Sequence, residues 1–283
     1  MTINNKAYYL PVVFFFLVIF SCFCPLVNYA QGDLLITPKR VVFEGATKTE
    51  QLNLANIGKD SATYQISFIQ IRMNEDGKFE KINQPDSGQF FADKNLRFFP
   101  RSVTLAPNEA QTVKVQLVRY NDLAPGEYRS HLYLRASPVQ KPLGEEIVPD
   151  KDSILSVRLT PIFGISIPVI IRKGESSAIV GITKAAWMLQ NDSTPGLSIT
   201  FARSGNMSVY GDIVVKHISP KGKTTQVGII KGLALYTPNT TRNFRMALDN
   251  NKDIDYHSGK LILLYSDQSS KAKILAEKEI ILQ

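Results

Sequence analysis

The sequence predicts an all-β protein built of two tandem β-sandwiches. From Leu34 onward, apolar and polar residues alternate with a period of two, which is typical of half-buried strands. Clusters of Gly, Pro, Asn and Asp interrupt this alternation at short intervals, as turns between strands do. The chain has 283 residues, which exceeds the usual size of one sandwich domain and favours two domains with separate cores.

The composition is that of a globular protein. Hydrophobic residues make up 44% of the chain and charged residues 20%, which excludes wholesale disorder and a multi-span membrane protein. The formal net charge is +8, but the basic residues stand singly or in pairs, without a stripe of interleaved aromatic residues. We therefore expect no nucleic-acid partner.

Residues 1–30 predict a secretory signal peptide. Lys6 is the only charged residue in this segment, and a nearly unbroken apolar run extends from Tyr8 to Phe23. A membrane anchor is the alternative, but the run between Pro11 and Pro25 is shorter than the roughly 20 residues that cross a bilayer. Ala30 suits the small residue at a cleavage site, so we expect cleavage near it and a secreted mature chain.

Both cysteines of the chain, Cys22 and Cys24, lie within this leader. A mature chain from Gln31 therefore has no disulfide, and its stability must come from core packing. The alternative is a membrane-tethered lipoprotein, because the residues from Ile19 to Cys22 resemble the box at which bacterial lipoproteins are cut and lipidated.

The first half of the mature chain predicts strands with one buried face. Tyr64, Ile66 and Phe68 alternate with polar residues, and the phase then changes to Ile69 and Ile71, which predicts a bulge. The same alternation returns at Val113–Leu117 and at His131–Arg135. Residues 83–95 predict a loop with one irregular turn, and residues 137–153 predict a long exposed connection.

The most unusual segment is Ile154–Ile171, where Arg158 is the only charged residue. Its odd-numbered positions form an apolar stripe broken only by Pro161. We predict a strand longer than the usual 5–6 residues. The stripe either serves the core, as we expect for Ile167 and Val169, or leaves part of its apolar side chains for another polypeptide.

The second half predicts an immunoglobulin-like sandwich without a disulfide. Strands are expected at Leu197–Ala202, Val209–His217, Val227–Leu235, Asn243–Leu248, Lys260–Tyr265 and Ile274–Leu282. A hinge is expected at Arg172–Glu175. The predicted domains are therefore an N-terminal immunoglobulin-like domain of residues 31–172 and a C-terminal one of residues 173–283.

The sequence predicts neither an enzyme nor a metal or cofactor site. His131, His217 and His257 are far apart, lack the spacing of metal ligands and are interpreted as surface or rim residues. None of the common hydrolase, phosphate-binding or calcium-loop motifs occurs. The acidic pairs lie in polar segments, where solvated charge is the simpler interpretation.

Four segments resemble, in the same order, those of the periplasmic chaperones of the chaperone/usher pilus pathway. They are Thr37–Gly45, Phe99–Arg101 with Leu105–Pro107 and Gln111–Val115, Pro125–Leu132, and Ser204–Asn206 with Tyr210–Ile213. The resemblance extends over nearly all of residues 34–248 and indicates a divergent member. It implies two immunoglobulin-like sandwiches set in an L, and no cofactor.

The resemblance also implies how the protein works. In that family, the last strand of the first domain completes the sandwich of an incomplete pilin by donor-strand complementation. Transferred to this chain, the donor residues are Leu155, Val157, Leu159, Phe163 and Ile165. The family also clamps the client's terminal carboxylate with an arginine and a lysine. Arg40 matches the arginine, but Ser166 stands at the lysine position, which leaves Arg158 and Arg172 as candidate substitutes.

The function expected from this resemblance is that of a periplasmic chaperone that binds and stabilises secreted pilus or surface-appendage subunits. The expected partners are pilin-like subunits and an outer-membrane usher, with a self-capping homodimer when no client is bound. The alternative is a structural or adhesion-associated surface protein whose long strand belongs entirely to its core.

Overall fold

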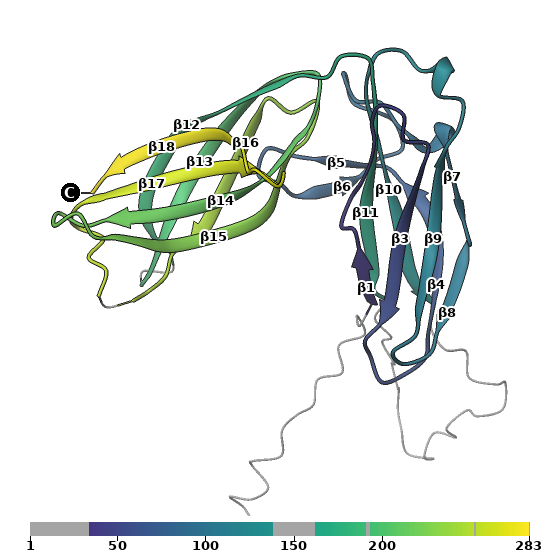
Figure 1. Ribbon diagram of the computed structural model, residues 1–283, viewed down its shortest axis with the longest axis horizontal. Coiled ribbons are helices and arrows are strands. Elements are labelled where there is room, and N and C mark those ends of the chain that lie inside the picture. The colour runs from purple at the N-terminus through teal and green to yellow at the C-terminus, as the bar shows by residue number, and fades with distance from the viewer. Residues whose placement is uncertain (1–33, 138–161, 191–192, 252, 283) are drawn as a thin grey trace, which may run out of the picture. The chain divides into compact units, whose positions relative to one another are not determined.

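The computed structural model describes residues 34–137, 162–190, 193–251 and 253–282, and Figure 1 shows their course. These residues form strands and two single-turn 3-10 helices, Asp93–Asn95 and Tyr120–Asp122. The predicted all-β class and the two sandwiches are confirmed. The predicted signal peptide with Cys22, and the connection from residue 138 to 153, lie outside the described residues.

The first sandwich consists of two sheets and a small hairpin. One sheet has the order β1-β3-β9-β7 and the other β2-β11-β10-β4-β8. The strands of the first sheet are β1 (Leu34–Thr37), β3 (Thr49–Asn56), β9 (Ala110–Leu117) and β7 (Leu96–Phe99). Those of the second are β2 (Val41–Phe43), β11 (Gly164–Lys173), β10 (Gly126–Ser137), β4 (Ala62–Ile69) and β8 (Ser102–Leu105). The hairpin pairs β5 (Ile71–Met73) with β6 (Phe79–Lys81).

The alternation in the sequence corresponds to the two faces of these strands. In β9, Val113, Val115 and Leu117 are buried, whereas Lys114 and Gln116 are exposed. The core between the two sheets also contains Leu52 and Leu132. Burial of these apolar faces supplies the main driving force for this sandwich.

The phase change near Ile69 is a change of partner, so the predicted bulge was wrong. β4 keeps an unbroken register with β10 from Thr63 to Ile69. The chain then leaves this sheet, and β5 pairs with β6 instead. Ile71 and Met73 are buried by new neighbours and do not continue the face of β4.

The second sandwich has seven strands in two sheets, with the orders β12-β13-β16 and β15-β14-β17-β18. Its strands are β12 (Ala178–Gln190), β13 (Thr194–Gly205), β14 (Val209–Ile218), β15 (Thr224–Leu235), β16 (Thr241–Ala247), β17 (Lys260–Asp267) and β18 (Ile274–Ile281). A separate apolar core, including Phe201, Leu263 and Tyr265, lies between its sheets. The six strands expected in this half are present, and β12 is an additional strand.

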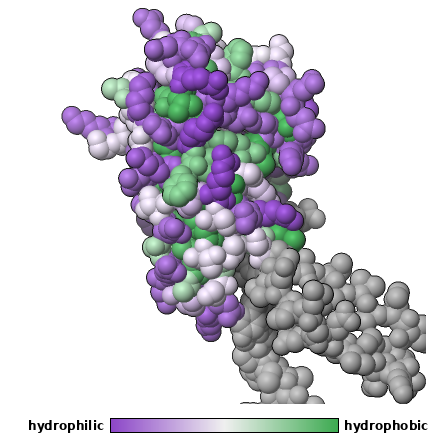
Figure 2. Space-filling view, turned by 90° about the vertical axis from the view of Figure 1, so that its right-hand side faces the viewer, coloured by the Kyte–Doolittle hydropathy of each residue, from purple (hydrophilic) through white to green (hydrophobic). Residues whose placement is uncertain are grey.

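The surface carries single apolar residues as well as charged ones. Figure 2, which faces the strands on the right-hand side of Figure 1, shows hydrophobic residues in small patches between hydrophilic ones. Scattered apolar residues of this kind are normal on soluble proteins and do not by themselves mark a binding site. Within the described residues, no helix is both long and apolar enough to span a membrane.

Candidate functional site

Strand β11 has two neighbours along only part of its length. It pairs with β10 from Gly164 to Lys173, but β2 pairs only with Val169–Ile171. Among the described residues, Gly164–Pro168 therefore have a strand on one side only. Alternate residues of an edge strand present their N–H and C=O groups outward, so this open edge can accept another strand. Pro168 has no N–H group, and proline within a sheet is typical of edge positions.

The apolar stripe of the sequence divides at this edge. Ile167 and Val169 are buried in the first core, as predicted. Ile165 is partly buried against the same core, whereas Phe163 lies just before β11 and is 47% exposed. Of the five predicted donor residues, the structure therefore describes Ile165 and Phe163. Leu155, Val157 and Leu159 lie outside the described residues.

Arg40 lies at the end of the open edge. The register of β2 and β11 places Val41 opposite Val169, so Arg40 is the residue just before this pairing begins. Before Arg40 the chain changes sheets, because β1 pairs with β3 and not with β11. This change of sheet leaves the line of β2 free beside Gly164–Pro168 in the described part of the chain.

The guanidinium of Arg40 has no acidic partner within ion-pair distance among the described residues. Its central carbon lies 4.4 Å from the centroid of the Tyr210 ring of β14, a cation–π contact. Burial lowers the pKa of Arg40, but an arginine stays charged in proteins. A half-buried cation without a carboxylate partner is a site where an external anion gains free energy by binding.

Arg172 is different, because its donors are already engaged. It contacts the carboxylates of Glu44 at 3.1 Å and Glu127 at 3.2 Å, and it donates to the carbonyl of Ser208 at 2.9 Å. Ser166 is exposed on β11 and provides no charge. Of the two candidates for the missing lysine, Arg172 therefore serves an internal network, and Arg158 lies outside the described residues.

Glu127 of β10 is the acceptor at the centre of that network. Its side chain is buried and accepts hydrogen bonds from the backbone N–H and hydroxyl of Ser208 and from the hydroxyl of Thr237. Since Ser208 and Thr237 adjoin strands of the second sandwich, this carboxylate connects the two sandwiches next to Arg40. The network fixes Arg172 in place, and its carboxylate makes no ion pair with Arg40.

A cavity of about 420 Å³ opens beside Arg40. Arg172, Ser208 and Tyr210 contribute to its polar wall. The remaining lining residues are Ala178, Ile179, Val180, Met207, Val209, Asp267, Lys273, Ile274 and Leu275. Local spacing in the sequence gave no signal for this cavity, because its residues come from β11, β12, β14, β17 and β18, from the residue before β2 and from the turns before β14 and β18.

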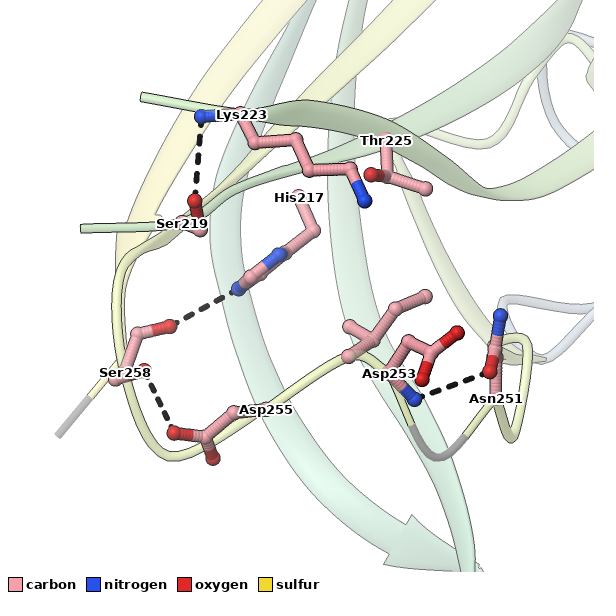
Figure 3. A pocket seen from close by; sticks show the side chains of 9 residues that line it. His217, Ser219, Lys223, Thr225, Asn251, Asp253, Asp255 and Ser258 are labelled. Carbon is pink, nitrogen blue, oxygen red and sulfur yellow. Dashed lines mark hydrogen bonds between the residues drawn. The ribbon is translucent and has the colours of Figure 1, made fainter. Parts of the chain in front are cut away.

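A second cavity, of about 150 Å³, lies in the second sandwich (Figure 3). His217 contacts the carbonyl of Ser258 at 3.0 Å, and Asp255 accepts the hydroxyl hydrogen of Ser258. These hydrogen bonds hold the loop before β17 in place, and the bond from Ser258 lowers the pKa of Asp255. In the described part of the chain, no three His, Cys, Asp or Glu residues are placed to hold a metal ion.

The interpretation of all three histidines as surface or rim residues was wrong for two of them. His131 and His217 are buried, and His257 is exposed. His131 lies among Arg129, Phe79 and Tyr236. Burial first, and the charge of Arg129 second, lower its pKa to about 3, so this imidazole is neutral near pH 7.

Neither a protein-family model nor a curated protein sequence matches the chain. Solved structures that are similar to it include the class 5 fimbriae chaperone CfaA, with a TM-score of 0.44 and 11% identity over 88% of this chain and 99% of that one. Others are the CupB2 chaperone of Pseudomonas aeruginosa (0.41 and 12%; 88% and 100% covered) and the E. coli chaperone DraB (0.41 and 13%; 88% and 96% covered).

Proposed function

We propose that this protein is a periplasmic chaperone that binds secreted pilus or surface-appendage subunits by donor-strand complementation. The observation that carries the proposal is the edge Gly164–Pro168, which is open among the described residues and ends at Arg40, a cation with no acidic partner in that part of the chain. Both features serve the binding of an extended polypeptide, so we propose binding and not catalysis. An added strand forms backbone hydrogen bonds of about 0.5–1.5 kcal/mol each.

The geometry also favours one direction for the client strand. β2 runs parallel to β11 and begins at Val41. A client strand that continues the line of β2 in the same direction therefore reaches Arg40 with its carboxyl terminus. A charge-assisted hydrogen bond between that carboxylate and the guanidinium contributes about 1.5–3 kcal/mol. With Ser166 at the family's lysine position, we propose that a single arginine supplies the anchor.

The remaining parts of this proposal come from the sequence. They are cleavage near Ala30 and release into the periplasm, and domains of residues 31–172 and 173–283. Leu155, Val157 and Leu159 complete the proposed donor stripe, together with Phe163 and Ile165. The usher, the self-capping homodimer and the lipoprotein alternative through Cys22 stay predictions.

The test compares two phenylalanines of the first sandwich with nearly equal exposure, Phe163 at 47% and Phe90 at 49%. Affinity-tagged wild type, Phe163→Asp and Phe90→Asp are expressed in the source bacterium and recovered from its periplasm, and co-purified proteins are identified by mass spectrometry. We expect wild type and Phe90→Asp to carry small secreted subunits, and Phe163→Asp to lose most of them. Each recovered subunit should aggregate when it is released from the complex.

Circular dichroism shows whether all three proteins are folded. Equal recovery of the same subunits by the three proteins would contradict the proposal. It would favour the alternative of a structural surface protein whose β11 belongs only to its own core.

A further inference from the structure

The cavity beside Arg40 has two chemically different walls. Arg40, Tyr210 and Ser208 form part of a polar wall that carries the unpaired positive charge. The other wall is apolar and is formed near the beginnings of β12 and β18. Its residues are Ile179, Val180, Ile274 and Leu275. A site that combines a cation with an aliphatic wall fits a ligand that has an anionic head and an apolar body.

The two isoleucines of this wall are directed away from the core. Ile179 is 76% exposed and Ile274 is 51% exposed, whereas their neighbours Val180 and Leu275 pack against the second core. Successive side chains of a strand point to opposite faces, which explains why the two isoleucines are exposed and their neighbours are not. Ile179 and Ile274 therefore contribute little to the core and keep apolar surface available in the cavity.

We infer that this cavity selects the last side chain of the client and that this side chain is aliphatic. The inference rests on the proposed function, because a terminal carboxylate held at Arg40 places the last residue at the cavity. Its volume of about 420 Å³ lies within the usual range of ligand pockets. Contact with the aliphatic wall stabilises the complex only when it removes apolar surface of the client from water. A polar terminal side chain has little apolar surface to bury there.

Four peptides test the inference. They are fluorescein-labelled decapeptides of one alternating valine–serine sequence that end in leucine, serine, aspartate or leucine amide. Their affinities for the protein, purified from the periplasm of an expression host, are measured by fluorescence anisotropy. We expect the leucine peptide to bind about tenfold more tightly than the serine peptide and more tightly than the aspartate peptide.

Variants of the protein separate the wall from the anchor. In Ile179→Ser/Ile274→Ser, the preference for leucine over serine should fall below threefold, while the preference for acid over amide is retained. In Arg40→Ala, the preference for acid over amide should disappear. The matched control is Ile281→Ser, which changes a residue of β18 that is 69% exposed and does not line the cavity, and it should behave as wild type.

The outcomes distinguish this inference from the proposed function. If none of the four peptides binds to the wild type, both are wrong. If the peptides bind but leucine and serine are equivalent, or aspartate binds most tightly, or the double variant keeps the full leucine preference, only the inference is overturned.

Discussion

The neutral imidazole of His131 illustrates how position decides the chemistry of a residue. His131 lies on β10, opposite Pro168 of β11, and its Nδ1 is buried without a hydrogen-bond partner among the described residues. The guanidinium of Arg129 makes a second positive charge there unfavourable. Protonation of His131 therefore opposes folding.

The pH dependence of stability should reveal this histidine. The unfolded chain takes up a proton near the ordinary pKa of 6.5, whereas the folded protein does so only at about 3. The stability from neutral His131 is thus complete above pH 6.5 and is lost as the pH falls toward 3, with a slope of up to about 1.4 kcal/mol per pH unit. His131→Phe retains the aromatic contacts and should lack this part of the slope.

Urea unfolding of wild type and His131→Phe at pH 7.5, 5.5 and 4.5 measures the effect. Because carboxylates titrate in both proteins, the informative quantity is the difference between their free energies of unfolding. This difference should shift in favour of the variant as the pH falls. A constant difference over this range would show that His131 takes up its proton at the same pH in the folded protein as in the unfolded chain, and that its pKa is not lowered.

At the scale of single residues, a family resemblance in the sequence singled out Arg40, but the sequence did not predict its surroundings. Tyr210, Glu127 and Ser208 are distant from Arg40 in the sequence, and only the fold brings them to it. The spacing of charged residues therefore gave no sign that Arg172 forms ion pairs and that Arg40 forms none with the described residues. Which arginine is paired depends on contacts between strands of different sheets.

At the scale of elements, strands with a regular period of two were predicted well. β9 and β14 have alternating burial because each has one face in a core. β12 was missed because a register shift between Ile182 and Lys184 interrupts its alternation, and because Gly181, Ala185 and Ala186 are weak strand formers. The change from β4 to β5 was misinterpreted because a phase change does not tell whether a strand bulges or changes partner.

Two substitutions separate the core role of β11 from the role toward a client that is proposed for the segment at its start. Ile171 is buried against the first core, whereas Phe163 is half exposed before the strand begins. Ile171→Ala should lower the free energy of unfolding by about 2–5 kcal/mol, since it removes buried methyl groups and leaves a cavity. Phe163→Ala should lower it by less than about 1 kcal/mol.

Urea denaturation of the two variants provides the comparison. A large loss of stability in Phe163→Ala would mean that this side chain belongs to the core. In that case, the donor role proposed for Phe163 would be wrong.

At the scale of the whole molecule, the hairpin of β5 and β6 connects the first sandwich to the second. The backbone N–H of Asn243 donates to the carbonyl of Glu75 at 2.7 Å, and Asn239 donates to the carbonyl of Met73. Arg242 of β16 contacts the same turn through the carbonyl of Glu75. These bonds involve residues more than 160 positions apart, so no local pattern in the sequence predicts them.

Gly77 in this turn allows Arg242 to approach. Its φ is +79°, and a Cβ atom there would collide with the guanidinium of Arg242. Gly77→Ala should therefore cost the strain of a left-handed residue, about 1–2 kcal/mol, and in addition displace Arg242. The matched control is Gly45→Ala, because Gly45 also has a positive φ, of +63°, but no atom lies within 4 Å of the added Cβ.

Calorimetric unfolding of both variants measures the two contributions. The excess loss in Gly77→Ala over Gly45→Ala should be about 1 kcal/mol. The unfolding transition of Gly77→Ala should also broaden or split as the connection between the sandwiches weakens. Equal losses in the two variants would show that Arg242 moves aside without cost.

The short strand β2 has a consequence for how polypeptides of different length are handled. It occupies the side of β11 from Val169 to Ile171, so a chain added along Gly164–Pro168 meets a barrier there. The added chain can advance up to this barrier and no further. The register of the added chain against β11 is then set by the position of its carboxyl terminus and does not depend on its total length. In the proposed complex, such a stop would let one protein bind many different polypeptides in the same register.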